Sequence, residues 1–346
     1  MTFVIGSYRP KKKIVYLDTN FVIDLTKARL GLMQDPGRQM RSLYSRLASL
    51  VRHNKVVCPY GVFHDAESEL STNLRDEIRG TIGLLSGGIH WRHWQTILDS
   101  QVVPALYKYC GKEEEVQPCD WREAFYQDPD EVLDPDRFPT IESAIRAEFP
   151  VDEQGLAAIR ASKQEYAQNM RTLPVREARR SYDDYLEEET RGFGALYKRP
   201  IAQLVLALEQ GDPSAIVSAC DAAKPTFRLY EWYLSRTGSE RKPLALDSHF
   251  LAFFASPEIG RIPSVHILAT LYAGLRFYYP KRTPRPGDAN DVRMVAAYMP
   301  YCDILATDKF VRDITSRLAL EREYAVAVYS LGPKDLPHLY QHLATL

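Results

Sequence analysis

Short apolar stretches, separated by longer stretches of helical spacing, make up both ends of the chain. Four of these stretches contain β-branched residues, and each of the first three leads into a helix-like segment. This alternation is typical of parallel strands that are connected by helices and buried on both faces. It predicts an α/β fold with strands at residues 13–17, 55–58, 303–306 and 324–331.

The middle of the chain has a different composition. Residues 111–150 contain 12 acidic and 4 basic residues, a local charge of −8, and their prolines indicate loop or broken helix. The stretch from there to residue 242 has mainly helical spacing. We therefore predict a discontinuous α/β domain formed by residues 1–110 and 243–346, interrupted by a mainly helical insertion at 111–242.

The charge distribution and the cysteines indicate which partners and which cellular compartment to expect. The chain has 44 basic and 45 acidic residues, a net charge of −1, so that without residues 111–150 the remainder sums to +7. This remainder is compatible with an anionic partner. The five cysteines are scattered without zinc-binding spacing, which favours reduced thiols and a cytoplasmic location. The most apolar long stretch, 262–279, contains His266 and Arg276, so we predict a buried helix and no membrane partner.

An aspartate directly follows the first predicted strand. The segment Lys-Ile-Val-Tyr-Leu-Asp-Thr-Asn ends its apolar run at Asp18, and a helix is predicted to begin at about Phe21. An ionised carboxylate at the end of a buried strand is unfavourable unless something compensates it. Ligands of open α/β sheets bind at the carboxyl ends of the strands. The alternative is that Asp18 and Asn20 are helix caps.

A second region near the other end of the chain has the same character. Asp291 lies at the start of a predicted helix, and the strand that follows this helix ends in Thr307 and Asp308. Because parallel strands end at one edge of the sheet, Asp18 and Asp308 should converge there, with Asp291 approaching from its helix. Carboxylates this close repel one another, and a divalent cation removes the repulsion. Oxygen ligands without Cys or His favour Mg²⁺ or Mn²⁺ over zinc.

This ordered set of motifs resembles the PIN domain, a family of metal-dependent nucleases. The resemblance rests on the strand-Leu-Asp-Thr-Asn opening, an acid on the helix after the second strand, Asp291, and the Thr-Asp at 307–308. It covers roughly residues 13–110 and 243–346. It implies a three-layer fold with a central parallel sheet and phosphodiester hydrolysis, with RNA expected before DNA as substrate. The long block at 111–242 departs from a compact PIN domain.

The second acid has three candidates, Asp65, Glu67 and Glu69. On a helical projection, Glu67 and Glu69 border the apolar stripe of this segment, whereas Asp65 points further away from it. We predict Glu67, with Glu69 next. Family members often have Ser or Thr six residues before this acid, where the present chain has Gly61.

Several neighbouring polar residues receive other roles. Asp303 precedes Asp308 by five residues, about 16 Å along a strand, so we predict a structural role at the opposite sheet edge. Asp288 is expected to cap its helix, to support the ligands or to serve as an additional ligand. Thr19, Asn20 and Thr307 are either local caps or groups that orient the ligands.

These observations predict a metal-dependent nuclease. Mg²⁺ or Mn²⁺ would be held by Asp18, Glu67, Asp291 and Asp308, which also form the catalytic set. The alternative is a PIN-like scaffold without catalysis that binds protein or nucleic acid. An inhibitory or regulatory protein partner and an oligomer are compatible with either. An aspartate-nucleophile phosphotransferase is a third interpretation, which Asn20 disfavours because such enzymes commonly have a second aspartate at that position.

Overall fold

The computed structural model describes residues 8–33, 37–70, 73–111, 119–131, 136, 140–141, 153–171, 180–237 and 248–346. Most of the acidic segment at 111–150 lies outside these residues, and so does the prediction that it is loop or broken helix. The chain forms two compact units. One contains the described residues of Ser7–Trp94, Trp121–Pro174 and Lys281–Leu346, and the other those of Gln95–Asp120 and Val175–Pro280.

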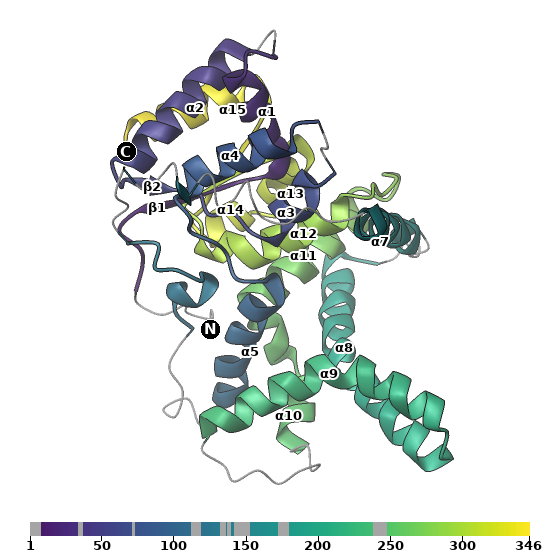
Figure 1. Cartoon of the computed structure of the whole chain (residues 1–346). Helices are drawn as coiled ribbons and strands as arrows, with labels where there is room; N and C mark the ends of the chain where they lie inside the picture. The colour runs from purple at the N-terminus through teal and green to yellow at the C-terminus, as the bar shows by residue number, and fades with distance from the viewer. Residues whose placement is uncertain are drawn as a thin grey trace. The chain divides into compact units, whose positions relative to one another are not determined.

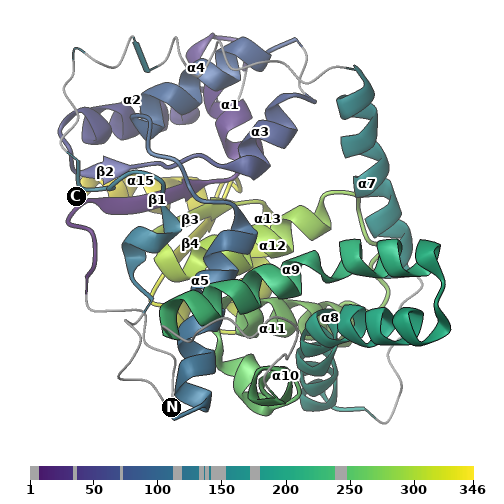
Figure 2. The same cartoon turned by 60° about the horizontal axis from the view of Figure 1, so that its bottom comes forward.

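Four parallel strands form the sheet of the first unit, in the order β2-β1-β3-β4 (Figure 2). Each observed strand overlaps its predicted range, so the predicted α/β architecture with a parallel sheet is confirmed. Ile14 to Leu17 are buried, as expected for a strand covered on both faces. The strands are β1 (Lys13–Leu17), β2 (Val56–Val57), β3 (Ile304–Thr307) and β4 (Ala327–Ser330).

One face of the sheet carries the main apolar core of this unit. Val15, Leu17, Ile304 and Ala306 point into it and meet the buried residues of four helices. In Figure 2 three of these helices, α1, α2 and α4, lie together beside the sheet. The four helices are α1 (Thr19–Arg29), α2 (Gly37–Arg52), α4 (Arg75–Ser86) and α15 (Asp335–Ala344).

The other face begins at Tyr16, which alternates with Val15 and Leu17 along β1. The Tyr16 ring lies 5.2 Å from that of His64 on α3 (Val62–Ser68) and 5.3 Å from that of Tyr298 at the end of α12 (Asp288–Tyr298). Helices therefore cover both faces of the sheet. The remaining helices of this unit are α7 (Glu153–Arg171), η2 (Trp121–Ala124), η5 (Met299–Tyr301), α13 (Lys309–Arg317) and α14 (Leu320–Glu323).

The second unit is helical. Gly211, in the left-handed conformation at φ 66°, ends α8, and Pro213 begins α9, so the two long helices reverse direction and pack side by side (Figure 1). Gly194 of α8 permits close packing, because a Cβ there would lie 2.0 Å from the carbonyl oxygen of Phe254. The elements are α5 (Trp94–Tyr109), α8 (Tyr182–Gln210), α9 (Pro213–Thr237), α10 (Ser248–Phe253), η4 (Pro257–Arg261) and α11 (Pro263–Tyr278).

The two units combine helices from both sides of the boundaries at residues 110 and 242. Residues 95–109 and 248–278, which the sequence pattern assigns to the α/β domain, lie in the unit that holds α8 and α9. Conversely, α7, which belongs to the predicted insertion at 111–242, lies in the unit of the sheet and packs against α12. Among the helices of the described segments, none is long and apolar enough to cross a bilayer.

Candidate functional site

Asp18 and Asp308 lie at the carboxyl edge of adjacent strands. Leu17 pairs with Ala306, and the Asp18 N–H donates a hydrogen bond of 2.8 Å to the carbonyl oxygen of Ala306. Asp18 is therefore next to Thr307, whose hydroxyl donates to Asp18 Oδ2 at 3.5 Å, and Asp308 follows directly. Since paired strands are about 4.8 Å apart, the register alone brings these two aspartates to the same end of the sheet.

Asp291 and Glu67 reach the same place from two helices. Asp291 lies in the first turn of α12, and Glu67 is the penultimate residue of α3. Burial, together with the charges of Glu67 and Asp308, raises the pKa of Asp18 to about 7. Burial and the charges of Asp18, Asp308, Glu67 and Asp288 raise the pKa of Asp291 well above its ordinary value. The four residues, hereafter the carboxylate cluster, thus share one electrostatic field.

The three candidates for the second acid have different surroundings. Glu69 is 3% exposed and accepts hydrogen bonds from Arg75 Nε at 2.7 Å and Arg79 Nη2 at 2.6 Å. Asp65 is more exposed, and its carboxylate lies 3.7 Å from His90 Nε2. Only Glu67 of the three is among the groups that raise the pKa of Asp18 and Asp291.

α3 is held against the end of β1 by His64, which sequence reasoning missed. The Gly61 N–H donates to Nδ1 at 3.1 Å, so Nε2 carries the proton and donates to the Leu17 carbonyl oxygen at 2.6 Å. Burial lowers the pKa of His64 and favours this neutral form. The ring therefore connects the first turn of α3, which leads to Glu67, with the residue before Asp18. The only sequence signal was a histidine three residues after a glycine that begins a helix.

The glycine at position 61 has a steric reason. A Cβ at Gly61 would lie 2.9 Å from Tyr298 Oη and 3.1 Å from Trp91 Cβ, inside ordinary contact distance. A larger residue at this position would need Tyr298 or Trp91 to move. Glycine at position 61 is thus explained by the two aromatic side chains packed against the start of α3.

Two further acids make ion pairs instead of joining the cluster. Asp303 lies at the opposite edge of the sheet, where its carboxylate contacts Arg9 at 2.7 Å and Lys13 at 2.9 Å. These contacts agree with the structural role predicted for it. Asp288, the first residue of α12, is buried and accepts hydrogen bonds from both Nη atoms of Arg282.

The short polar residues beside the cluster have three different environments. Thr307 bonds Asp18, as described above. The Thr19 hydroxyl is buried and, within the described part of the chain, has no hydrogen-bond partner. Asn20 is exposed and lines a polar cavity of about 440 Å³ between α1 and the start of α4. Asp18 is the N-cap residue of α1, but its side chain makes no capping hydrogen bond, which disfavours the cap interpretation.

Two basic side chains, which the sequence analysis did not predict to be near the site, lie close to the carboxylate cluster. Lys163 Nζ of α7 contacts Glu67 Oε1 at 2.9 Å, and both side chains are less than a fifth exposed. Arg282 is the other, and its positive charge interacts with Asp308 and Asp291. With the side chains in these positions, no three His, Cys, Asp or Glu residues of the described segments are grouped closely enough to hold a metal ion.

Asp308 has a structural function as well. It is the N-cap of α13, and its Oδ1 accepts a hydrogen bond of 2.7 Å from the Val311 N–H. Asn caps helices as well as Asp does, and it also removes one of the repelling charges, so Asp308→Asn should keep or slightly raise the stability to urea, whereas Asp308→Ala, which lacks the cap, should be less stable than Asp308→Asn by about 1 kcal/mol. If both variants lost equal stability, the carboxylate charge rather than the cap would stabilise this end of β3.

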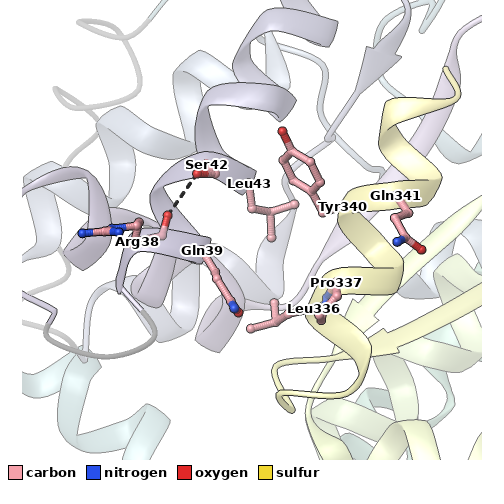
Figure 3. Close-up of a pocket in the computed structure, with 8 residues that line it drawn as sticks. All are labelled: Arg38, Gln39, Ser42, Leu43, Leu336, Pro337, Tyr340 and Gln341. Atoms are coloured by element: carbon pink, nitrogen blue, oxygen red, sulfur yellow. Dashed lines mark hydrogen bonds between the residues drawn. The ribbon is translucent and has the colours of Figure 1, made fainter.

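A separate cavity of about 430 Å³ lies between α2 and α15 (Figure 3). Leu43, Leu336 and Tyr340 point into the gap between the two helices, and the Ser42 hydroxyl donates to the Arg38 carbonyl oxygen at 3.1 Å. No carboxylate is among the residues that line it. Its chemistry therefore differs from that of the carboxylate cluster.

The candidate site thus consists of four acids from four separate segments, two of them with raised pKa values, together with Lys163, which contacts Glu67, and Arg282, whose charge interacts with Asp308 and Asp291. Comparisons of the chain with protein-family models, with curated proteins and with solved structures found no match, so its function has to be argued from its own residues.

Proposed function

We propose that this protein is a metal-dependent nuclease that hydrolyses phosphodiester bonds, with RNA as the preferred substrate, and that its sheet unit is PIN-like. The observation that carries the proposal is the convergence of carboxylates from four separate segments, two of them directly after the paired strands β1 and β3, and this convergence also raises the pKa of Asp18 and Asp291. Such an arrangement opposes folding unless it serves a ligand. Helices on both faces of the parallel sheet are consistent with the three-layer fold that the resemblance implies.

The donor set fits a hard divalent cation in chemistry. Its ligands would be carboxylate oxygens, which Mg²⁺ and Mn²⁺ accept and which zinc sites use less often. Ligation requires side chains to move, because as they lie no three acids of the described segments are close enough to share an ion, and Glu67 must also give up its contact with Lys163. Asp308 can keep its helix cap through Oδ1, since the second carboxylate oxygen remains for a ligand. When bound, the cation would lower the pKa of a coordinated water and neutralise charge on the leaving oxygen.

The residues around the cluster then have defined tasks. Thr307 holds the Asp18 carboxylate by donating to Oδ2, and His64 keeps α3 against the end of β1 so that Glu67 stays near Asp18. Since a bound cation would supply the activated water, the site would need no histidine base. His64 is buried and committed to backbone contacts, in agreement with this arrangement.

The proposal is tested by incubating the purified protein with labelled single-stranded RNA, single-stranded DNA and duplexes, in Mn²⁺ or in EDTA. We expect cleavage of single-stranded RNA in Mn²⁺, none in EDTA, and none by Asp291→Asn in either condition. Cleavage that is indifferent to both the chelator and the substitution would come from a contaminant, and the proposal would fail.

A second candidate function is a non-catalytic scaffold. It is favoured by the fact that two of the four acids already have protein partners, Glu67 with Lys163 and Asp308 with the start of α13. A scaffold needs no cation, so its unfolding temperature should not depend on Mn²⁺. A nuclease should be stabilised saturably, because a ligand that binds only the folded state raises stability by RT ln(1 + [L]/Kd).

Lys163 provides a further prediction. Its ammonium group competes with any cation for Glu67, so Lys163→Met should tighten Mn²⁺ binding by about tenfold, equivalent to about 1.4 kcal/mol of removed repulsion. The measurement is the Mn²⁺ concentration at half of the thermal shift. Lys309→Met is the matched control, because Lys309 is exposed and pairs with Asp313 within α13. An unchanged midpoint for Lys163→Met would show that Lys163 does not compete.

A further inference from the structure

The loop between α11 and α12 brings positive charge to an acidic site. Residues 281–287 contain Lys281, Arg282 and Arg285, and the next residue, Asp288, begins the helix that carries Asp291. Lys281 and Arg285 are exposed, whereas the Arg282 side chain is only 20% exposed. Arg282 is therefore the basic residue of this loop that is built into the structure.

The Arg282 guanidinium is fixed from two sides. Its two Nη atoms donate to the two carboxylate oxygens of Asp288, the Nη2–Oδ1 distance being 2.7 Å. Its central carbon lies 3.6 Å from the ring centroid of Phe310, two residues after Asp308. Asp288 is itself buried and also accepts the Arg285 N–H at 2.8 Å. The guanidinium thus has little freedom to move away.

The same contacts place the guanidinium beside the carboxylate cluster. Asp288 and Asp291 are three residues apart on α12 and so lie on neighbouring positions of one helix face. Phe310 follows Asp308 in the first turn of α13. Within the described part of the chain, two of the five N–H groups of Arg282 bond to protein, which leaves donors for a ligand.

A phosphodiester approaching this site meets four carboxylates that repel it. A fixed guanidinium at the rim offsets this repulsion and offers the planar pair of donors that matches phosphate oxygens. If Arg282 served only to neutralise Asp288, its guanidinium would not need to lie near Asp291 and Asp308 as well. We propose that Arg282 is a substrate-binding residue that donates hydrogen bonds to the backbone phosphate of the nucleic acid at the carboxylate cluster. This inference rests on the proposed nuclease function.

The test compares Asp288→Asn with the double variant Asp288→Asn/Arg282→Gln. Arg282→Gln alone would leave the buried Asp288 charge without its partner and is prone to misfolding. In the Asp288→Asn background this charge is absent, so the second substitution isolates the effect of the guanidinium. Cleavage of labelled single-stranded RNA in Mn²⁺ gives kcat and KM at several salt concentrations, and the thermal shift with Mn²⁺ alone reports the metal site.

We expect the double variant to have a kcat/KM about 10- to 100-fold below that of Asp288→Asn, the range for a charge-assisted hydrogen bond. A plot of log kcat/KM against log salt concentration should have a slope that is shallower by about 0.7, the value for one phosphate contact on a single strand. The Mn²⁺ concentration at half of the thermal shift should stay equal or decrease, because the positive charge of Arg282 near the metal ligands has been removed. Arg282→Lys, which keeps a cation beside Asp288, should keep the salt slope and raise KM.

Equal kcat/KM and equal salt slopes for Asp288→Asn and the double variant would overturn this inference and leave the proposed function intact. A double variant with a lost Mn²⁺ shift would also overturn it, because Arg282 would then act on the metal site instead of the substrate. A wild-type protein with neither RNA cleavage nor a Mn²⁺ shift would overturn the proposed function itself, and this inference with it.

Discussion

Asp18→Asn is expected to make the metal-free protein more stable and, at the same time, to abolish its response to Mn²⁺. The substitution removes one of four carboxylates that repel one another when ionised, and the repulsion of two charges about 4 Å apart is about 1 kcal/mol in bulk water and about 4 kcal/mol at an effective dielectric of about 20. Part of this becomes a gain of about 1 kcal/mol in the free energy of unfolding. Loss of the cation should lower RNA cleavage by about 10³-fold, or roughly 4 kcal/mol of transition-state stabilisation.

Urea unfolding in EDTA and in Mn²⁺ measures both halves of this prediction. Asp303→Asn is the control, because Asp303 lies at the opposite sheet edge and pairs with Arg9 and Lys13. That variant should lose stability and keep the full Mn²⁺ response. If Asp18→Asn were instead less stable than the wild type in EDTA, Asp18 would be a structural residue of the β1–α1 junction and the carboxylate cluster would not be a strained site.

Substitution by glutamine is expected to have opposite consequences at Glu69 and Glu67: a loss of stability at Glu69 and a loss of cleavage at Glu67. Glu69→Gln removes the carboxylate that contacts the buried Arg79 at 2.6 Å and the largely buried Arg75 at 2.7 Å, so it should lower the free energy of unfolding by about 3 kcal/mol. The fraction that remains folded should keep its Mn²⁺ response and its cleavage rate. Glu67→Gln removes a partly exposed ion pair and should change stability by at most about 1 kcal/mol, while cleavage is lost.

Urea titrations of the two variants, combined with cleavage rates corrected for the folded fraction, measure this contrast. The reverse pattern, in which Glu69→Gln is stable but unresponsive to Mn²⁺ and Glu67→Gln is fully active, would assign the second ligand to Glu69. That outcome would also remove the role of Lys163 as a competitor, since Lys163 contacts Glu67.

The strands and the end of the sheet where the acids lie could be predicted from the sequence, because strands depend on the local pattern of apolar and β-branched residues. The run Lys-Ile-Val-Tyr-Leu has the β-branched and apolar composition of a buried strand, and it forms β1. Once two strands are parallel, their carboxyl ends meet, so the proximity of Asp18 and Asp308 follows from topology. Glu67 was chosen from the apolar stripe of a single helix, and its charge acts on Asp18 in the structure.

The basic residues beside the carboxylate cluster could not be predicted from the sequence, because their positions depend on tertiary packing. Lys163 is 96 residues from Glu67, and nothing in its own helix marks it as a partner. Arg282 is only six residues from Asp288, but its bearing on the cluster depends on how the 281–287 loop folds back over Phe310. The grouping of α5 and α11 with α8 and α9 escaped prediction for a related reason. Helical spacing identifies an apolar face, but it does not identify the helix that covers it.

A crystal structure in Mn²⁺ with anomalous diffraction data would show directly whether the four carboxylates, which come from distant parts of the chain, form one site for a divalent cation. We expect an anomalous peak bounded by Asp18, Asp291 and Asp308, with Glu67 turned from Lys163 towards the ion. Saturating Mn²⁺ that leaves this position without a peak and the Glu67–Lys163 contact intact would contradict this expectation.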